Sequence, residues 1–264
     1  MAFKEIKNFS DDGYSVINNM FNLRDVENFK KNVRLLVPDI KDIFYKTKAS
    51  FKKNARFKKI TPGIHDHNVL LNPSLNLDFI EQNSKFKLIL KKLFKSDYFI
   101  EEKWLLRNIP TRSFPEWLKE EIKDIGMPQL NMYVHEKFRD ISYIYGLDYH
   151  QDNGGRKRDS VTVIIYLDDV LKLSDTPIRI LPGSHKLGAT HYPHYCRATN
   201  DKKKIVYSDF LGNHLITKDE KIYGKSGCSI IFNGYVIHGS EPLLSSSKER
   251  LAIRYVLSPT KVIK

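Results

Sequence analysis

Residues 149–154 read Tyr149-His150-Gln151-Asp152-Asn153-Gly154, and the interpretation of the chain starts from this stretch. In extended backbone, residues two apart point to the same side, so His150 and Asp152 present an imidazole and a carboxylate together. A third ligand has to come from elsewhere, and the best candidate is His238. Two imidazoles and one carboxylate leave the opposite coordination positions open, which is the arrangement suited to non-haem Fe(II) and oxygen chemistry.

A later strand, residues 250–257, carries two arginines on one face. Alternation places Arg250 and Arg254 on the side opposite to the apolar residues Leu251, Ile253 and Tyr255. An arginine that faces the inside of a barrel is costly unless it meets an anion, and guanidinium grips a carboxylate with two parallel hydrogen bonds. The pattern therefore favours a ligand with a carboxylate. A surface ion pair of Arg250 with Glu249 is the plainer alternative.

The order of the expected elements predicts a mainly β protein with α-helical additions. Helical spacing and capping residues predict helices over 22–36, 75–95 and 113–126. From Met127 the period becomes alternating, with strands expected at 129–134, 140–149, 161–167, 178–181, 227–232, 235–238 and 250–257. Many short strands separated by turn signals indicate a sandwich or a closed barrel. The insertion 186–223 has the size of a lid or a binding segment.

Composition favours one folded domain over residues 1–264, with a mostly helical part at 1–126 and most of the β core at 127–264. A hydrophobic share of 41% and an aromatic share of 12% exclude a disordered chain. We expect no secretory signal and no membrane span, because no window reaches roughly 20 apolar residues. The two cysteines, Cys196 and Cys228, indicate reduced thiols, so we expect a cytoplasmic protein.

The net charge of +13 leaves the partner open. Lysine is dense at 52–59, 85–95 and 202–204, and such a field attracts phosphate, coenzyme A, an acidic carrier protein or nucleic acid. Ordinary solvated faces of a lysine-rich chain explain the same runs. A second cluster, His65-Asp66-His67, is interpreted as an exposed polar loop, because three adjacent side chains do not face one ion in regular structure.

Taken in order, four segments resemble the phytanoyl-CoA dioxygenase family. They are His150-Gln151-Asp152, then Ile180-Leu181-Pro182-Gly183-Ser184-His185-Lys186, then Asn233-Gly234-Tyr235-Val236-Ile237-His238-Gly239-Ser240, and Arg250. The resemblance covers about residues 129–257. It implies a double-stranded β-helix (a jelly roll, cupin-like) with N-terminal helices packed on the barrel. It also implies dependence on Fe(II), on 2-oxoglutarate as co-substrate and on O2.

The resemblance also assigns roles to residues. It implies that His150, Asp152 and His238 bind iron, that Arg250 holds the distal carboxylate of 2-oxoglutarate, and that Ser240 assists it. Tyr133 falls on the strand where the family often contacts the co-substrate. The chain departs from the family at Ile164, where a tryptophan is common. Arg254 is a second departure, because it competes for the anchor role or binds substrate.

The implied reaction is hydroxylation of an aliphatic C–H bond in a small molecule, with release of succinate and CO2. Asp152 fills the position that related halogenases leave for halide, which favours hydroxylation. The substrate is expected to be anionic, such as a CoA or carrier-protein thioester or a phosphonate, or to be an amino acid. A nucleic-acid partner is not expected. Two alternatives remain: an oxidative demethylase of nucleic acid, and a non-catalytic cupin-like binding protein.

Overall fold

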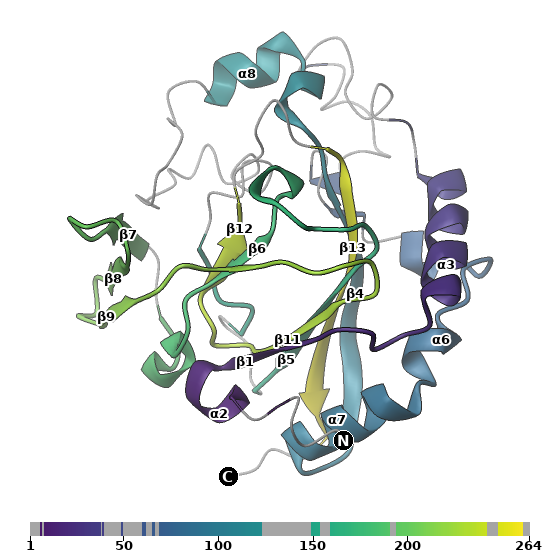
Figure 1. Cartoon of the computed structure of the whole chain (residues 1–264), viewed down its shortest axis with the longest axis horizontal. Coiled ribbons are helices and arrows are strands. Elements are labelled where there is room, and N and C mark those ends of the chain that lie inside the picture. The colour runs from purple at the N-terminus through teal and green to yellow at the C-terminus, as the bar shows by residue number, and fades with distance from the viewer. Residues whose placement is uncertain are drawn as a thin grey trace.

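Seven strands form the largest sheet of the protein (Figure 1). The computed structural model describes residues 6, 8–37, 39, 49, 60–61, 65–66, 69–122, 149–153, 159–190, 194–241 and 248–260. The sheet is antiparallel and runs in the order β1 (Tyr14–Ile17), β11 (Ser229–Asn233), β5 (Val161–Tyr166), β13 (Arg250–Pro259), β4 (Tyr98–Asn108), β3 (His65–Asp66) and β2 (Ile60–Thr61). β13 lies between β5 and β4 and is buried along its whole length. Its two faces therefore both contact other parts of the protein.

One face of this sheet packs against helices. α3 (Leu23–Leu36) begins at Asn22, whose side chain accepts a hydrogen bond from the Arg24 amide, and it buries Val26, Phe29 and Val33. α7 (Ser84–Phe94) is capped in the same way by Asn83. The helices share one apolar cluster with the sheet residues Val163, Ile165, Leu251, Ile253, Tyr255 and Leu257. This cluster confirms the predicted apolar face of the strand at 250–257. Figure 1 shows α3, α6 (Asp78–Glu81) and α7 grouped beside β4 and β13.

The other face packs against a smaller sheet. This sheet has the order β10 (Glu220–Ile222), β6 (Ile178–Ile180), β12 (His238–Ser240), and both pairs are antiparallel. A second apolar cluster joins the two sheets, with Ile164, Tyr166, Ile230, Phe232 and Ala252 from the large one and Ile178, Ile180 and Ile222 from the small one. Apolar side chains of both sheets therefore pack together in part of the space between them.

The insertion at 186–223 contains three strands that pair with one another. β7 (His194–Ala198), β8 (Ile205–Asp209) and β9 (His214–Thr217) form an antiparallel sheet of their own. Cys196, Ile205 and Tyr207 pack it onto Tyr149, Leu181 and Ile237 of the body. In the described part of the chain, the remaining short helices are α2 (Phe9–Asp12), α8 (Glu116–Ile122), η1 (Val69–Leu71), η2 (Thr111–Ser113), η5 (Leu173–Asp175) and η6 (Ser184–Leu187). The insertion therefore contributes an ordered small sheet, and its role as a lid or binding segment stays a prediction.

The first part of the chain contains strands besides its expected helices. It carries α3, α7 and α8, and it also supplies β1 and β4 to the main sheet. The strands expected at 129–134 and over most of 140–149 lie outside the described residues. Within the described part of the chain, no helix is long and apolar enough to cross a membrane.

The contact between α7 and the sheet gives a matched test of the core. Leu90 is fully buried, whereas Leu88, two residues earlier in the same helix, is 57% exposed. We expect Leu90→Ala to lower the free energy of unfolding by about 2–5 kcal/mol, because it leaves a cavity against the sheet. Leu88→Ala should stay within about 0.5 kcal/mol of the parent protein. Urea unfolding of the two variants measures the difference, and equal losses would contradict the packing described here.

Candidate metal centre

A backbone pair brings two histidines together. The His150 amide donates to the His238 carbonyl at 2.9 Å, and the His238 amide donates to the His150 carbonyl at 3.0 Å. Residues paired directly across two strands project to the same face, and the two ring centroids are 4.3 Å apart. The pair joins the stretch at 149–153 to β12 of the small sheet.

Asp152 completes the cluster. One of its oxygens lies 3.8 Å from His150 Nε2, and the other lies 3.7 Å from His238 Nε2. One ligand atom from each of the three residues lies within 4.8 Å of the others, and this is the one such group of three or more His, Cys, Asp or Glu ligands among the described residues. Three side chains from two distant parts of the sequence therefore face one point.

The protonation states suit a divalent metal. Burial lowers the pKa of His238 to about 3, so its imidazole is neutral at ordinary pH. Burial by itself would raise the pKa of Asp152, but its neighbours, foremost the adjoining Arg254 guanidinium, outweigh burial and hold that pKa well below its usual value. Neutral imidazole and ionised carboxylate are the forms that bind metal ions.

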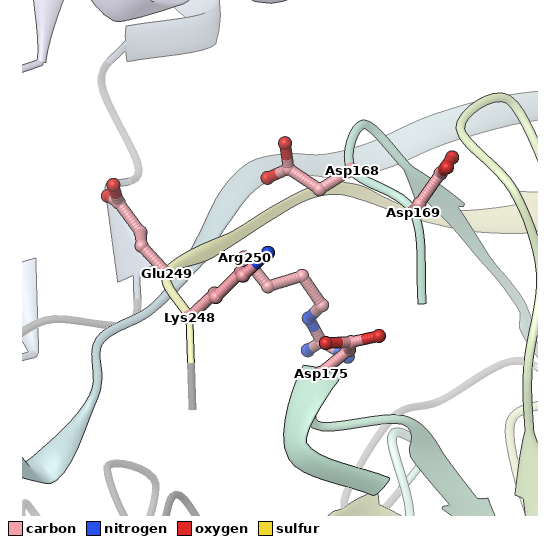
Figure 2. Close-up of a pocket in the computed structure, with 6 residues that line it drawn as sticks. All are labelled: Asp168, Asp169, Asp175, Lys248, Glu249 and Arg250. Carbon is pink, nitrogen blue, oxygen red and sulfur yellow. The ribbon is translucent and has the colours of Figure 1, made fainter. Parts of the chain in front are cut away.

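Arg250 lies on the same side of β13 as Arg254, but further from the His150, Asp152 and His238 cluster. It is 2% exposed, donates from Nη2 to Asn108 Oδ1 at 2.9 Å, donates from Nη1 to the Thr176 carbonyl, and stands 5.4 Å from the ring centre of Tyr166. No described residue accepts a hydrogen bond from its Nε. Figure 2 shows this side chain extending from β13 toward the end of η5, where Asp175 lies. It lines a pocket of about 200 Å³ with Asp168, Asp169, Asp175, Lys248 and Glu249.

The family model described as phytanoyl-CoA dioxygenase (PhyH) matches residues 9–252. The chain belongs to this family. The match confirms the resemblance seen in the sequence and extends it to the first part of the chain. A search of curated proteins finds no match.

Solved structures of similar fold include two described as non-haem α-ketoglutarate-dependent enzymes and one solved with 2-oxoglutarate bound. SnoN of nogalamycin biosynthesis, an epimerase solved with Fe3+, α-ketoglutarate and nogalamycin RO, is 11% identical with a TM-score of 0.56, over 98% of this chain and 83% of that one. SnoK, a carbocyclase of the same biosynthesis, is 12% identical with a TM-score of 0.55, over 97% and 83%. HygX of Streptomyces hygroscopicus, solved with nickel and 2-oxoglutarate, is 16% identical with a TM-score of 0.53, over 97% and 86%.

The remaining residues predicted for the family's site have different outcomes. Ser240 lies on β12 two positions after His238, and therefore on the same side of that strand. Tyr133 lies outside the described residues. His65 and Asp66 form β3 beside β4, while His67 is not described, so the loop expected there is a strand at its first two residues.

Gln151, between the two ligands, was not singled out from the sequence. Its side-chain Nε2 donates to the carbonyls of Gly188 and Tyr235 at 2.8 and 2.7 Å. Its side-chain Oε1 accepts from the Thr190 backbone amide at 2.8 Å. Because alternation turns Gln151 away from the metal face, its side chain fixes the backbone of the ligand stretch from behind. The position of a polar residue between two candidate ligands was the one feature of the sequence that could have pointed to Gln151.

A buried charge network fixes the residue just before His150. Tyr149 donates a hydrogen bond to Asp219 at 2.7 Å, and Asp219 receives two-pronged donation from Arg179 of β6, with Nη2 at 2.7 Å. The Arg179 guanidinium also lies 4.9 Å from the Tyr149 ring centre. Arg179 lies opposite Gly239 in the strand pairing, directly after His238. The network therefore joins both ligand-bearing segments on the side away from the ligands.

Tyr149→Phe tests this support. We expect a loss of about 1.5–3 kcal/mol in the free energy of unfolding, because a buried hydrogen bond to an ionised carboxylate is removed. Tyr223→Phe is the control, since Tyr223 is 43% exposed, and it should change stability by no more than about 0.5 kcal/mol. Thermal and urea unfolding provide the measurement. A Tyr149→Phe protein as stable as the control would show that the network contributes little.

Proposed function

We propose that this protein is an Fe(II)- and 2-oxoglutarate-dependent oxygenase that hydroxylates an aliphatic C–H bond of a small molecule and releases succinate and CO2. The observation that carries the proposal is the convergence of His150, Asp152 and His238 on one point between the sheets. Membership of the family supports it. We also infer that the two packed sheets are the walls of a double-stranded β-helix.

The donor set fits iron. Two imidazoles and one carboxylate are the ligands of the facial-triad sites that hold non-haem Fe(II) and leave positions for other ligands. His238 Nδ1–H donates to the Val236 carbonyl at 3.1 Å; this places the ring proton on Nδ1 and leaves Nε2 for the metal. In the proposal, His150, Asp152 and His238 hold the iron, which with 2-oxoglutarate and O2 supplies the oxidising chemistry when bound.

Strand register supports Arg250 as the anchor for 2-oxoglutarate. On the large sheet, Thr162, which touches Asp152, is paired with Val256, and Tyr166, which touches Arg250, is paired with Ala252. On the small sheet, His238 is paired with Ile180 and Ser240 with Ile178. The Ile178 amide donates to the Tyr166 hydroxyl at 3.0 Å, so Ser240 and Arg250 belong to the same end of the site.

This arrangement suits a dicarboxylate lying between the sheets. One end would reach the metal ligands, and the other would meet the Arg250 guanidinium, with the Ser240 hydroxyl as a second donor. The Nε of Arg250 has no acceptor among the described residues, which is what a donor reserved for a ligand would show. Tyr133 remains part of the proposal as a further co-substrate contact. The apolar residues between the sheets, such as Ile164 and Ala252, would keep water away.

The substrate is proposed to be a small molecule, either anionic or an amino acid. The net charge of +13 supports an anion, including a CoA or carrier-protein thioester or a phosphonate. SnoN and SnoK, which share the fold, are an epimerase and a carbocyclase, so product analysis has to accompany the turnover assay. Asp152 as a third ligand favours hydroxylation over halide transfer.

Asp152→Ala tests the metal assignment. We expect it to reduce Fe(II)- and 2-oxoglutarate-dependent succinate release to background, because one of three protein ligands is lost. It should also abolish the thermal stabilisation of the parent protein by Mn(II), which is about 2.7 kcal/mol when the metal is at 100 times its Kd. Asp201→Ala, at an exposed turn of the β7–β9 sheet, is the control and should retain both. Activity in Asp152→Ala would remove the assignment.

Arg250→Lys tests the anchor. The ammonium keeps the charge but loses the two-pronged geometry. A charged hydrogen bond contributes about 1.5–3 kcal/mol, so the KM for 2-oxoglutarate should rise roughly 10- to 100-fold. Arg197→Lys, on the exposed side of β7, should leave that KM unchanged. Initial rates over a range of 2-oxoglutarate concentrations measure both variants, and an unchanged KM in Arg250→Lys would argue for another anchor.

A further inference from the structure

Both oxygens of the Asp152 carboxylate are held by protein donors. Thr162 Oγ1 donates to Oδ2 at 2.6 Å, and Arg254 Nη2 donates to Oδ1. Thr162 is fully buried and Arg254 is 8% exposed. The two donors come from β5 and β13, the neighbouring central strands of the large sheet. The carboxylate is therefore fixed from the sheet side, with its two imidazole neighbours on the other.

Arg254 is itself fixed in place. Its guanidinium lies 4.5 Å from the ring centre of Trp104, the residue paired with it on β4. Its Nη1 lies 3.4 Å from Oε2 of Glu102, two residues earlier on the same strand. A planar guanidinium that stacks on an aromatic ring and reaches two carboxylates has little freedom to turn. A lysine ammonium cannot reproduce that geometry.

We propose that Arg254, together with Thr162, is a positioning residue that sets the orientation of the Asp152 carboxylate toward the metal. This inference rests on the proposed function, because it concerns the metal ligand set. It assigns Arg254 to the metal end of the site. Four residues of strand separate Arg254 from Arg250, about 13 Å. Arg254 is thus not the co-substrate anchor.

Two effects of Arg254 on a bound metal have opposite signs. Its charge repels a divalent cation, whereas its hydrogen bond orients the ligand, and partners of this kind typically contribute 10- to 100-fold in metal affinity. Glu102 already shares the charge of Arg254 from the other side. With two carboxylates on one guanidinium, the repulsion is largely compensated, and orientation is the larger effect.

The test uses Co(II) binding to the metal-free full-length protein, with three variants and one control. Arg254→Lys keeps the charge, Arg254→Gln removes it, and Thr162→Val removes the neutral donor at nearly constant volume. Lys103→Met is the control, because it removes the Lys103–Glu81 ion pair from the opposite face of β4. The readouts are the Co(II) dissociation constant, the visible absorption spectrum of bound Co(II), and thermal unfolding without metal.

We expect each of the three variants to bind Co(II) roughly 10- to 100-fold more weakly, with an altered Co(II) spectrum. Lys103→Met should keep the parent affinity and spectrum. A merely structural role would lower the unfolding temperature without changing the spectrum of the folded fraction. If Arg254→Gln fails to fold, Arg254→Lys and Thr162→Val decide the question.

Two results would overturn the inference. Parent-like affinity and spectrum in the Arg254 variants would show that Asp152 needs no positioning. Tighter binding in Arg254→Gln would show that the arginine only competes with the metal. A different result addresses the proposed function instead: if the parent protein fails to bind Co(II), or Asp152→Ala binds it equally well, then the ligand assignment fails whatever Arg254 does.

Discussion

The backbone pair between His150 and His238 is the constraint on which the rest of the site depends. It joins residues 149–153, of which Asp152 and Asn153 lie in a turn, to the edge strand β12. Without this pair the two imidazoles would belong to separate parts of the protein. The pair fixes His150 opposite His238. Asp152 then lies on the same face as His150, because it is two positions further along the chain. Gln151 and the Tyr149–Asp219–Arg179 network hold that segment from the opposite side.

Three of the four arginines that are buried among the described residues have distinct places around the site. Arg179 joins the two ligand-bearing segments from behind, Arg254 contacts the carboxylate of the cluster, and Arg250 lies at the far end beside Tyr166. Each guanidinium stacks near an aromatic ring and meets an acceptor, as a buried charge requires. Arg179 and Arg250 differ at Nε: that of Arg179 donates to Asp219, whereas that of Arg250 meets no acceptor within the described chain.

Local patterns in the sequence predicted part of this arrangement. The spacing of His150 and Asp152 predicted a shared face, and the alternation in β13 predicted its apolar side. Asn22 predicted the start of α3. β4 was missed because charged residues, Glu101, Glu102 and Lys103, stand in the middle of the strand, where it is only partly buried. Its identity as a strand depends on pairing with β13, far away in the sequence. The contact between Arg254 and Asp152 also depends on the pairing of segments far apart in the sequence, so no local pattern predicts it. The strands of the insertion did leave a signal, because Ile205, Tyr207 and Asp209 alternate with more exposed neighbours.

β13 serves the core with one set of residues and the site with the other. Leu251, Ile253, Tyr255 and Leu257 face the helices, while Arg250, Ala252 and Arg254 face the small sheet. A point substitution affects one of these surfaces. A one-residue insertion or deletion inside the strand would exchange them, placing guanidinium groups against the helices and leucines beside the carboxylate. In the descendants of this protein, a change in the length of β13 is therefore more disruptive than a substitution at one of its positions.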